Sequence, residues 1–235
     1  MFKGFTQNTI DFFLQLRENN NKQWFDEHRG EYREYVYQPF RELAAEMLPM
    51  MLSIDPQLDI TPGRAVSRIN RDIRFSRNKS PYRANMWVTF KGSYGDWKEK
   101  PVFFFELFPE FYRYGMGYYN TPKEVMTRIR TLIDDNDKEF MKIHRLYKKQ
   151  DVFTIEGEKY KKVMNKNIPD DLAEWYQRKD IFFVCNRMDD LIFRNELIDV
   201  MMEHFNLIKP IYEYLKKITA ECRNTEEYAF HQFYI

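Results

Sequence analysis

Apolar residues in the first fifty positions recur at helical spacing. Between Ile10 and Leu14 they follow the i, i+3, i+4 pattern of a one-sided helix, and Thr6 precedes them as a residue type that caps helix N-termini. The Asn19–Asn21 run breaks the pattern, because Asn favours caps and turns. A second helix is expected from about Lys22, with a bend at Pro39, whose ring removes a backbone donor.

Between residues 64 and 119 the hydrophobic period changes from a helical spacing to two, which is typical of strands with one buried face. The pattern predicts four strands, over residues 64–74, 86–90, 102–108 and 112–118. The connections at 92–96 and 109–110 are too short for crossover helices. Neighbouring strands should therefore run antiparallel, as a meander.

The remaining residues predict helices on either side of this sheet. A helix should start at Thr121-Pro122, and a long one should begin near residue 190, where apolar positions alternate at spacings of three and four. Shorter elements are expected as a hairpin at 153–163, a helix at 169–177 and a strand at 181–185. The fold class predicted is a single α+β domain over 1–235, with its central antiparallel sheet at about 64–119 flanked by N-terminal and C-terminal helices.

Composition excludes several classes of protein. Of the 235 residues, 43% are hydrophobic and 17% aromatic, far more than a disordered chain carries. Apolar runs end well short of the ~18 residues that span a bilayer, and no secretory signal is visible, so no membrane partner and a cytoplasmic location are expected. Cys185 and Cys222 lack metal-ligand or disulfide spacing, and no nucleotide-loop motif is present. We therefore expect no metal and no cofactor.

Charge is concentrated in one segment. The whole chain has a net charge of +1, yet residues 64–83 hold seven Lys or Arg against one Asp, leaving −5 for the rest. If this segment is extended, its two faces alternate. One face would hold Arg68, Asn70, Asp72 and Arg74, and the other Ile69, Arg71, Ile73 and Phe75. Arginine forks match carboxylate and phosphate oxygens two at a time, so the segment is a candidate anion site.

The favoured interpretation is a pocket for a small phosphate or carboxylate ligand, with Asp72 fixing the geometry of the arginines around it. The candidate ligand-binding residues are Arg68, Asn70, Arg71, Asp72, Arg74, Lys79 and Tyr82, with Glu106 and Arg113 in support. A second interpretation is a structural or interaction protein whose Arg-Asp-Glu network is internal: Arg71 is buried against Glu106, and the remaining charges form a solvated salt-bridge lattice.

The third interpretation is binding of single-stranded nucleic acid, with Trp87 and the Tyr112–Tyr118 row as stacking platforms. The near-neutral net charge makes this the least favoured of the three. No motif of an activated nucleophile or a metal-bound water is present, so the sequence leaves open whether the protein is an enzyme. The oligomeric state is open too, because the long C-terminal helix could pack on its own sheet or form a dimer seam.

Three stretches carry a resemblance to a known family. They are Phe2-Lys3-Gly4-Phe5, the 19–25 stretch Asn-Asn-Asn-Lys-Gln-Trp-Phe, and the 68–82 stretch from Arg68 through Arg71-Asp72 to Pro81-Tyr82. Together with Tyr114–Tyr118 they resemble the bacterial family catalogued as domain of unknown function 2461, over most of the chain. The resemblance implies a cytoplasmic α+β protein without an assigned activity, and it transfers no catalytic residue.

Overall fold

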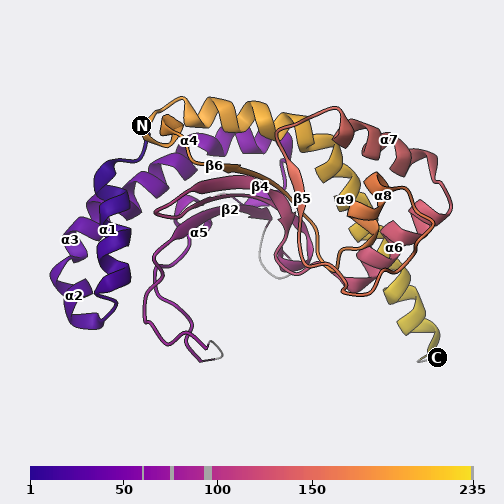
Figure 1. Cartoon of the computed structure of the whole chain (residues 1–235), viewed down its shortest axis with the longest axis horizontal. Helices are drawn as coiled ribbons and strands as arrows, with labels where there is room; N and C mark the ends of the chain where they lie inside the picture. Colours follow the sequence, from indigo (N-terminus) through magenta and orange to yellow (C-terminus); the bar gives the residue numbers. More distant parts are fainter. Residues whose placement is uncertain (60, 75–76, 93–96, 234–235) are drawn as a thin grey trace. The chain divides into compact units, whose positions relative to one another are not determined.

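A computed structural model gives the fold; it describes residues 1–59, 61–74, 77–92 and 97–233, with side chains up to Arg223 except that of Asp59 (Figure 1). The α-helices are α1 Gln7–Glu18, α2 Lys22–Glu27, α3 Arg29–Glu31, α4 Gln38–Ile54, α5 Pro62–Ala65, α6 Lys123–Asp134, α7 Lys138–Lys148, α8 Asp170–Tyr176 and α9 Leu197–Phe233. A π-helix, η1, spans Tyr32–Tyr37, and 3-10 turns lie at Trp97–Glu99 (η2) and Asp190–Phe193 (η3). The strands are β1 Leu58–Asp59, β2 Met86–Gly92, β3 Pro101–Leu107, β4 Tyr112–Tyr118, β5 Thr154–Glu156 and β6 Phe182–Arg187.

These elements confirm the α+β class. The strands form one sheet in the order β1-β2-β3-β4-β6-β5, so the expected meander of β2, β3 and β4 lies at its centre. β2 pairs antiparallel with β3, with Val88 opposite Phe105, and the connection expected at 92–96 lies outside the described residues apart from Gly92. The hairpin expected at 153–163 does not form, because β5 pairs with β6 instead.

Contacts along the chain divide it into two compact units. The first unit comprises Met1–Gly92, Phe103–Tyr114 and Asn186–Glu203, and the second comprises Ser93–Val102, Gly115–Cys185 and His204–Ile235. Each unit is therefore assembled from three separate stretches of chain. That the whole of 1–235 acts as a single domain stays a prediction.

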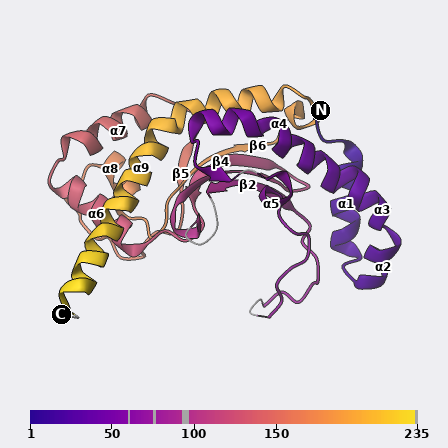
Figure 2. The ribbon, with the colours of Figure 1, turned by 180° about the vertical axis from the view of Figure 1, so that it is seen from behind.

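In the first unit, α4 runs along the face of β2 (Figures 1 and 2). Aromatic rings fill the space between this helix and the sheet: Phe5 stacks on Phe105 of β3 at 5.6 Å and meets Phe40 of α4 edge-on at 4.8 Å. The chain turns into this core at Gly4, which has φ +96°, and an added Cβ there would lie 2.3 Å from the Phe193 backbone. Only glycine fits both constraints, which gives a physical reason for the Phe-Lys-Gly-Phe start.

The expected second helix is broken and then distorted. It ends at Glu27, and after the short α3 the chain adopts the π-helix η1, in which Gln38 N–H donates to the Arg33 carbonyl five residues back. Pro39 explains the distortion, because it has no N–H for the Tyr35 carbonyl four residues earlier. That carbonyl instead accepts a 2.6 Å hydrogen bond from the buried Thr9 hydroxyl.

The strand expected over residues 64–74 does not form. The chain there starts with α5 and then pairs at two isolated bridges, Val66 with Val88 and Asn70 with Tyr82. Residues 66–74 and 77–85, which we call the arm, leave the sheet as two extended segments (Figure 1). Three backbone hydrogen bonds hold its base, Ser67 N to Trp87 O, Arg71 N to Pro81 O and Arg83 N to Ile69 O. Pro81 lacks an N–H, so a continuous ladder is not available; Phe75 lies outside the described residues.

In the second unit, α6, α7 and α8 gather around the C-terminal part of α9 (Figure 2). Trp175 is fully buried at their centre, with Phe140 edge-on at 5.3 Å and Phe183 at the same distance. Within this unit β4 passes very close to β6: a Cβ on Gly115 would lie 2.0 Å from the Phe183 carbonyl oxygen. Glycine is therefore required inside this strand by close backbone approach.

Candidate functional site

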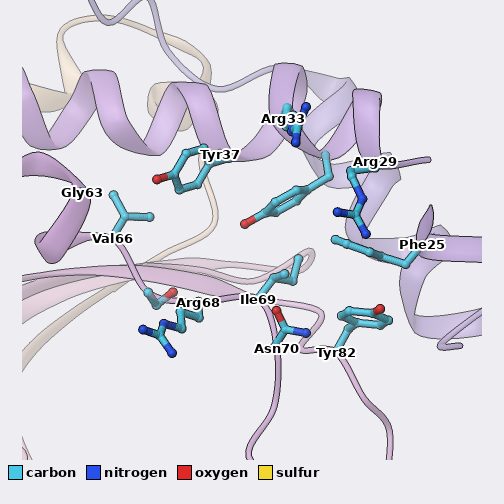
Figure 3. Close-up of a pocket in the computed structure, with 12 residues that line it drawn as sticks. Phe25, Arg29, Arg33, Tyr37, Gly63, Val66, Arg68, Ile69, Asn70 and Tyr82 are labelled. Carbon is cyan, nitrogen blue, oxygen red and sulfur yellow. The ribbon is translucent and has the colours of Figure 1, made fainter. Parts of the chain in front are cut away.

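A pocket of about 400 Å³ opens within the first unit, between the N-terminal helices and the base of the arm (Figure 3). The helical side contributes Phe25, Arg29, Tyr32, Arg33 and Tyr37. The opposite side is formed by Gly63 of α5 and by Val66, Ser67, Arg68, Ile69, Asn70 and Tyr82 of the arm. Its volume falls in the range of small-molecule sites.

Three arginines and no acidic residue line this pocket. Arg29 forms an ion pair with Asp26, whose second partner is Lys22. Arg33 and Arg68 are exposed, and neither side chain makes a hydrogen bond or ion pair with another described residue. Their guanidinium donors remain open to a ligand, and the positive charge of the lining attracts anions.

The π-helix supplies an aromatic wall. With its wider turn, η1 brings Tyr32 and Tyr37, five residues apart, onto one side, where their ring centroids lie 6.1 Å apart. Burial raises the pKa of the Tyr32 hydroxyl, which contacts the Met86 sulfur at 3.7 Å. The Tyr37 hydroxyl has no hydrogen-bond partner among the described residues, and in Figure 3 it points toward the Gly63–Val66 turn.

A clamp from the Asn triplet fixes the far end of the pocket. Asn20 binds the Tyr82 backbone twice: its amide donates to the Tyr82 carbonyl at 3.1 Å, and its side-chain oxygen accepts from the Tyr82 N–H at 3.0 Å. Phe25 stacks on the Tyr82 ring with centroids 4.1 Å apart. The family-like stretches at 19–25 and 68–82 therefore meet at this wall.

Of the predicted ligand-binding residues, Arg68, Asn70 and Tyr82 line the pocket. Arg71, Asp72, Arg74 and Lys79 lie further along the arm, outside the lining. Asp72 accepts from Arg74 Nε at 3.0 Å and Nη2 at 2.7 Å, which lowers the pKa of its carboxyl to about 2. Lys79 Nζ donates to the Ile73 carbonyl at 2.9 Å. In the outer arm, which we define as residues 71–74 and 77–79, several charged side chains thus bond to groups of the arm itself.

The expected pairing of Arg71 with Glu106 is wrong. Glu106 accepts from Arg113 Nη2 at 2.7 Å on its Oε2 and from the Asn85 amide at 2.7 Å on its Oε1. Arg113 lies on the neighbouring strand β4, so it reaches the carboxylate without leaving the sheet. Arg71 Nε is buried without a hydrogen-bond partner in the described structure. Glu106 and Arg113 therefore support the sheet and do not line the pocket.

The tyrosine row expected as a nucleic-acid stacking platform is inaccessible. Tyr112, Tyr114 and Tyr118 are each 1% exposed or less, which places them in the core. Trp87 is half-buried, and the Arg83 guanidinium lies 4.9 Å from the centre of its ring. Alternating tyrosines on a strand face the core here, so they cannot stack with bases.

Sequence reasoning missed the helical side of the pocket, in particular Arg29, Arg33 and Tyr37. Their charges resemble those of an ordinary solvated helix face. One signal was available: Arg29 and Arg33 are like charges at i and i+4, an arrangement that destabilises a helix unless an anion or acid offsets it. Within the π-turn that aligns Tyr37 with Tyr32, the Tyr35 carbonyl is bonded by Thr9, far away in sequence.

A sequence profile described as "Conserved hypothetical protein (DUF2461)" matches residues 8–214. The chain belongs to the DUF2461 family. This confirms the resemblance drawn from the three short stretches. A comparison with curated proteins found no match.

Metal-binding clusters and membrane-spanning helices are both absent from the described part of this DUF2461 protein. Within residues 1–58, 61–74, 77–92 and 97–223, no three His, Cys, Asp or Glu side chains gather closely enough to hold a metal ion. In the same described part of the chain, no helix combines the length and apolar character of a bilayer span.

Proposed function

We propose that this protein binds a small anionic ligand, a phosphate or a carboxylate, in the pocket between the N-terminal helices and the arm. The observation that carries the proposal is a lining with three arginines and no acid, in which Arg33 and Arg68 have no partner among the described residues. An oxyanion that accepts hydrogen bonds from a guanidinium gains about 1.5–3 kcal/mol per charged bond. We propose a cytoplasmic location for this activity.

Geometry also supports a ligand that bridges the two sides. Arg33 comes from the helical side and Arg68 from the arm, and Figure 3 draws their guanidinium groups well apart, so a ligand that contacts both has to extend across the pocket between them. Arg68 lies between two bridges that hold the backbone of the arm, Val66 with Val88 of β2 and Asn70 with Tyr82 across the arm. The backbone of Arg68 is therefore held in place, while its guanidinium group has no partner among the described residues.

The experiment is a calorimetric titration with inorganic phosphate and with citrate, comparing wild type with Arg68→Gln. The matched control is Arg77→Gln, because Arg77 is an exposed arginine of the same arm that does not line the pocket. We expect Arg68→Gln to weaken binding at least about tenfold and Arg77→Gln to change it less than about twofold. Equal losses in the two variants, or no anion binding by wild type, would contradict the proposal.

The structural interpretation makes the opposite prediction for the same variants. The outer arm has features that favour it, since Asp72 pairs with Arg74 and Lys79 binds the Ile73 carbonyl. If the arginines at 33 and 68 served stability alone, their replacement would lower the unfolding midpoint and leave no anion binding to lose. Denaturant unfolding of Arg33→Gln and Arg68→Gln distinguishes the two interpretations.

A further inference from the structure

We infer that the ligand carries a planar heterocyclic ring beside its anionic group, and that a mononucleotide is the class of compound that fits the pocket. This inference rests on the proposed function, because the same arginines would hold the phosphate. It goes further by assigning the rest of the pocket. Three features carry it: the size of the pocket, the chemistry of its aromatic wall, and two polar groups left without partners.

Size argues against a bare oxyanion. The pocket measures about 400 Å³, within the range of about 300–1,000 Å³ that holds cofactor-sized ligands. One phosphate bound at Arg33 or at Arg68 would leave most of this space to water. A ligand with a body attached to its phosphate displaces that water and gains contacts with both walls.

The wall chemistry points to a flat ring. The aromatic rings of the lining form one row: Tyr37 lies 6.1 Å from Tyr32, Tyr32 lies 5.3 Å from Phe25, and Phe25 stacks on Tyr82 at 4.1 Å between ring centroids. Bases stack on aromatic side chains because every base has a π-face. Phe25 and Tyr82 already cover one another. Tyr37 is half-buried, and the Arg41 guanidinium lies 5.8 Å from the centre of its ring, so a base would stack on the ring face that Arg41 leaves open.

Two polar groups on the same lining can form hydrogen bonds with the edge of a heterocyclic ring. The Asn70 amide is exposed and forms no side-chain hydrogen bond with any described residue, and the Tyr37 hydroxyl is likewise unpartnered. An asparagine amide offers one acceptor and two donors, the pattern that matches the edge of a nucleobase. A sugar phosphate without a base would leave both groups to water.

The test compares the affinities of inorganic phosphate, ribose 5-phosphate, adenosine monophosphate and uridine monophosphate by calorimetry. We expect the two mononucleotides to bind at least about tenfold more tightly than ribose 5-phosphate, the amount that one stacked base contributes. Ribose 5-phosphate binding as tightly as the mononucleotides overturns this inference and leaves the proposed function standing. If no anion binds at all, both fall.

Variants locate the ring. Tyr37→Leu should reduce mononucleotide affinity to that of ribose 5-phosphate and leave ribose 5-phosphate binding unchanged, whereas Tyr35→Leu, on the same π-helix but outside the lining, should change neither. Gly63→Phe should weaken mononucleotide binding at least about tenfold by placing a bulky side chain in the lining, where a Cβ on Gly63 meets nothing within 4 Å. Gly30→Phe is its control, because Gly30 is equally open and lies outside the lining. Equal effects of Tyr37→Leu and Tyr35→Leu would overturn the assignment of the ring to this wall.

Discussion

Arg178 in the second unit and Arg68 in the first both follow a short helix and lie at or between isolated β-bridges, yet their surroundings are opposite. Arg178 is 7% exposed, and its guanidinium donates to the carbonyls of Ile155 at 2.5 Å and Gly157 at 2.6 Å and to the Glu174 carboxylate at 2.8 Å. Arg68 is exposed and has no such partner among the described residues.

Arg130 and Arg33 repeat the contrast. Arg130, 9% exposed, donates to the Tyr176 carbonyl at 3.0 Å and the Arg178 carbonyl at 2.6 Å, which satisfies groups at the end of α8. Arg33 projects from η1 into the lining of the pocket with no described partner. Carbonyl groups thus accept from the guanidinium donors of Arg130 and Arg178, whereas no described group accepts from those of Arg33 and Arg68.

The largest expected effect follows from removing a buried arginine. Arg178→Met should lower the free energy of unfolding by about 3 kcal/mol, because the carbonyls of Ile155 and Gly157 lose their donor while remaining shielded from water. Urea denaturation measures this loss. Arg77→Met serves as the exposed control, with an expected change below about 0.5 kcal/mol. A loss below about 1 kcal/mol for Arg178→Met would break the distinction between the two kinds of arginine.

The exposure of Arg113 lies between that of the buried Arg178 and that of the exposed Arg68. Its side chain is 34% exposed, against 14% for its partner Glu106. Glu106→Gln should lower the free energy of unfolding by about 2 kcal/mol, since Arg113 and the Asn85 amide both lose a charged acceptor. A double-mutant cycle should show coupling between Glu106 and Arg113 and none between Glu106 and Arg71. Coupling to Arg71 instead would refute the pairing.

Thr9 connects stability to the shape of the pocket. Thr9→Val should cost about 1–2 kcal/mol, because the Tyr35 carbonyl loses the hydrogen bond that replaces the one missing at Pro39. The π-helix should then relax, and mononucleotide affinity should fall along with stability. Thr131→Val is the control, since that hydroxyl bonds a carbonyl within its own exposed helix turn. Loss of stability with full ligand affinity would show that the π-helix does not position the pocket.

The smallest expected effect is at the outer arm, where Asp72 and Arg74 neutralise one another. The hydrogen bonds from Arg74 lower the pKa of the Asp72 carboxyl to about 2, below its ordinary 3.8. A lowered folded pKa means that this pair adds stability above pH 4 and loses it as pH falls toward 2. Carboxyl NMR should show a midpoint near pH 2 in wild type and a return toward 3.8 in Arg74→Gln. An unchanged midpoint in that variant would show that Arg74 is not what lowers the pKa of Asp72.

Local pattern predicted much of this fold because its elements depend on nearby residues. Period two identified β2, β3 and β4, and Thr6 with the Asn triplet marked the ends of α1 and α2. The same pattern failed at 64–74, because alternation specifies an exposed face and says nothing of a partner strand. With Pro81 opposite Arg71, the two sides of the arm pair only at isolated points.

Only part of the candidate site could be predicted from the sequence, because local pattern identifies only residues that are close together in the chain. Arg68, Asn70 and Tyr82 were found because they share one basic segment. Arg33 and Tyr37 became part of the site through folding: Asn20 ties the helices to Tyr82, and the π-helix turns Tyr37 onto the side of Tyr32. No spacing in the sequence encodes a contact across about 35 or 60 positions.

The most direct test of the account follows the arginine Nε–H signals by NMR while phosphate is added. Before the addition, the Nε–H groups of Arg130 and Arg178 should exchange slowly with water, since they are hydrogen-bonded and buried, and those of Arg33 and Arg68 should exchange fast. On addition, the account predicts that the signals of Arg33 and Arg68 shift and become protected while those of Arg130 and Arg178 stay in place. Unmoved signals at Arg33 and Arg68, or equal shifts in both groups, would contradict it.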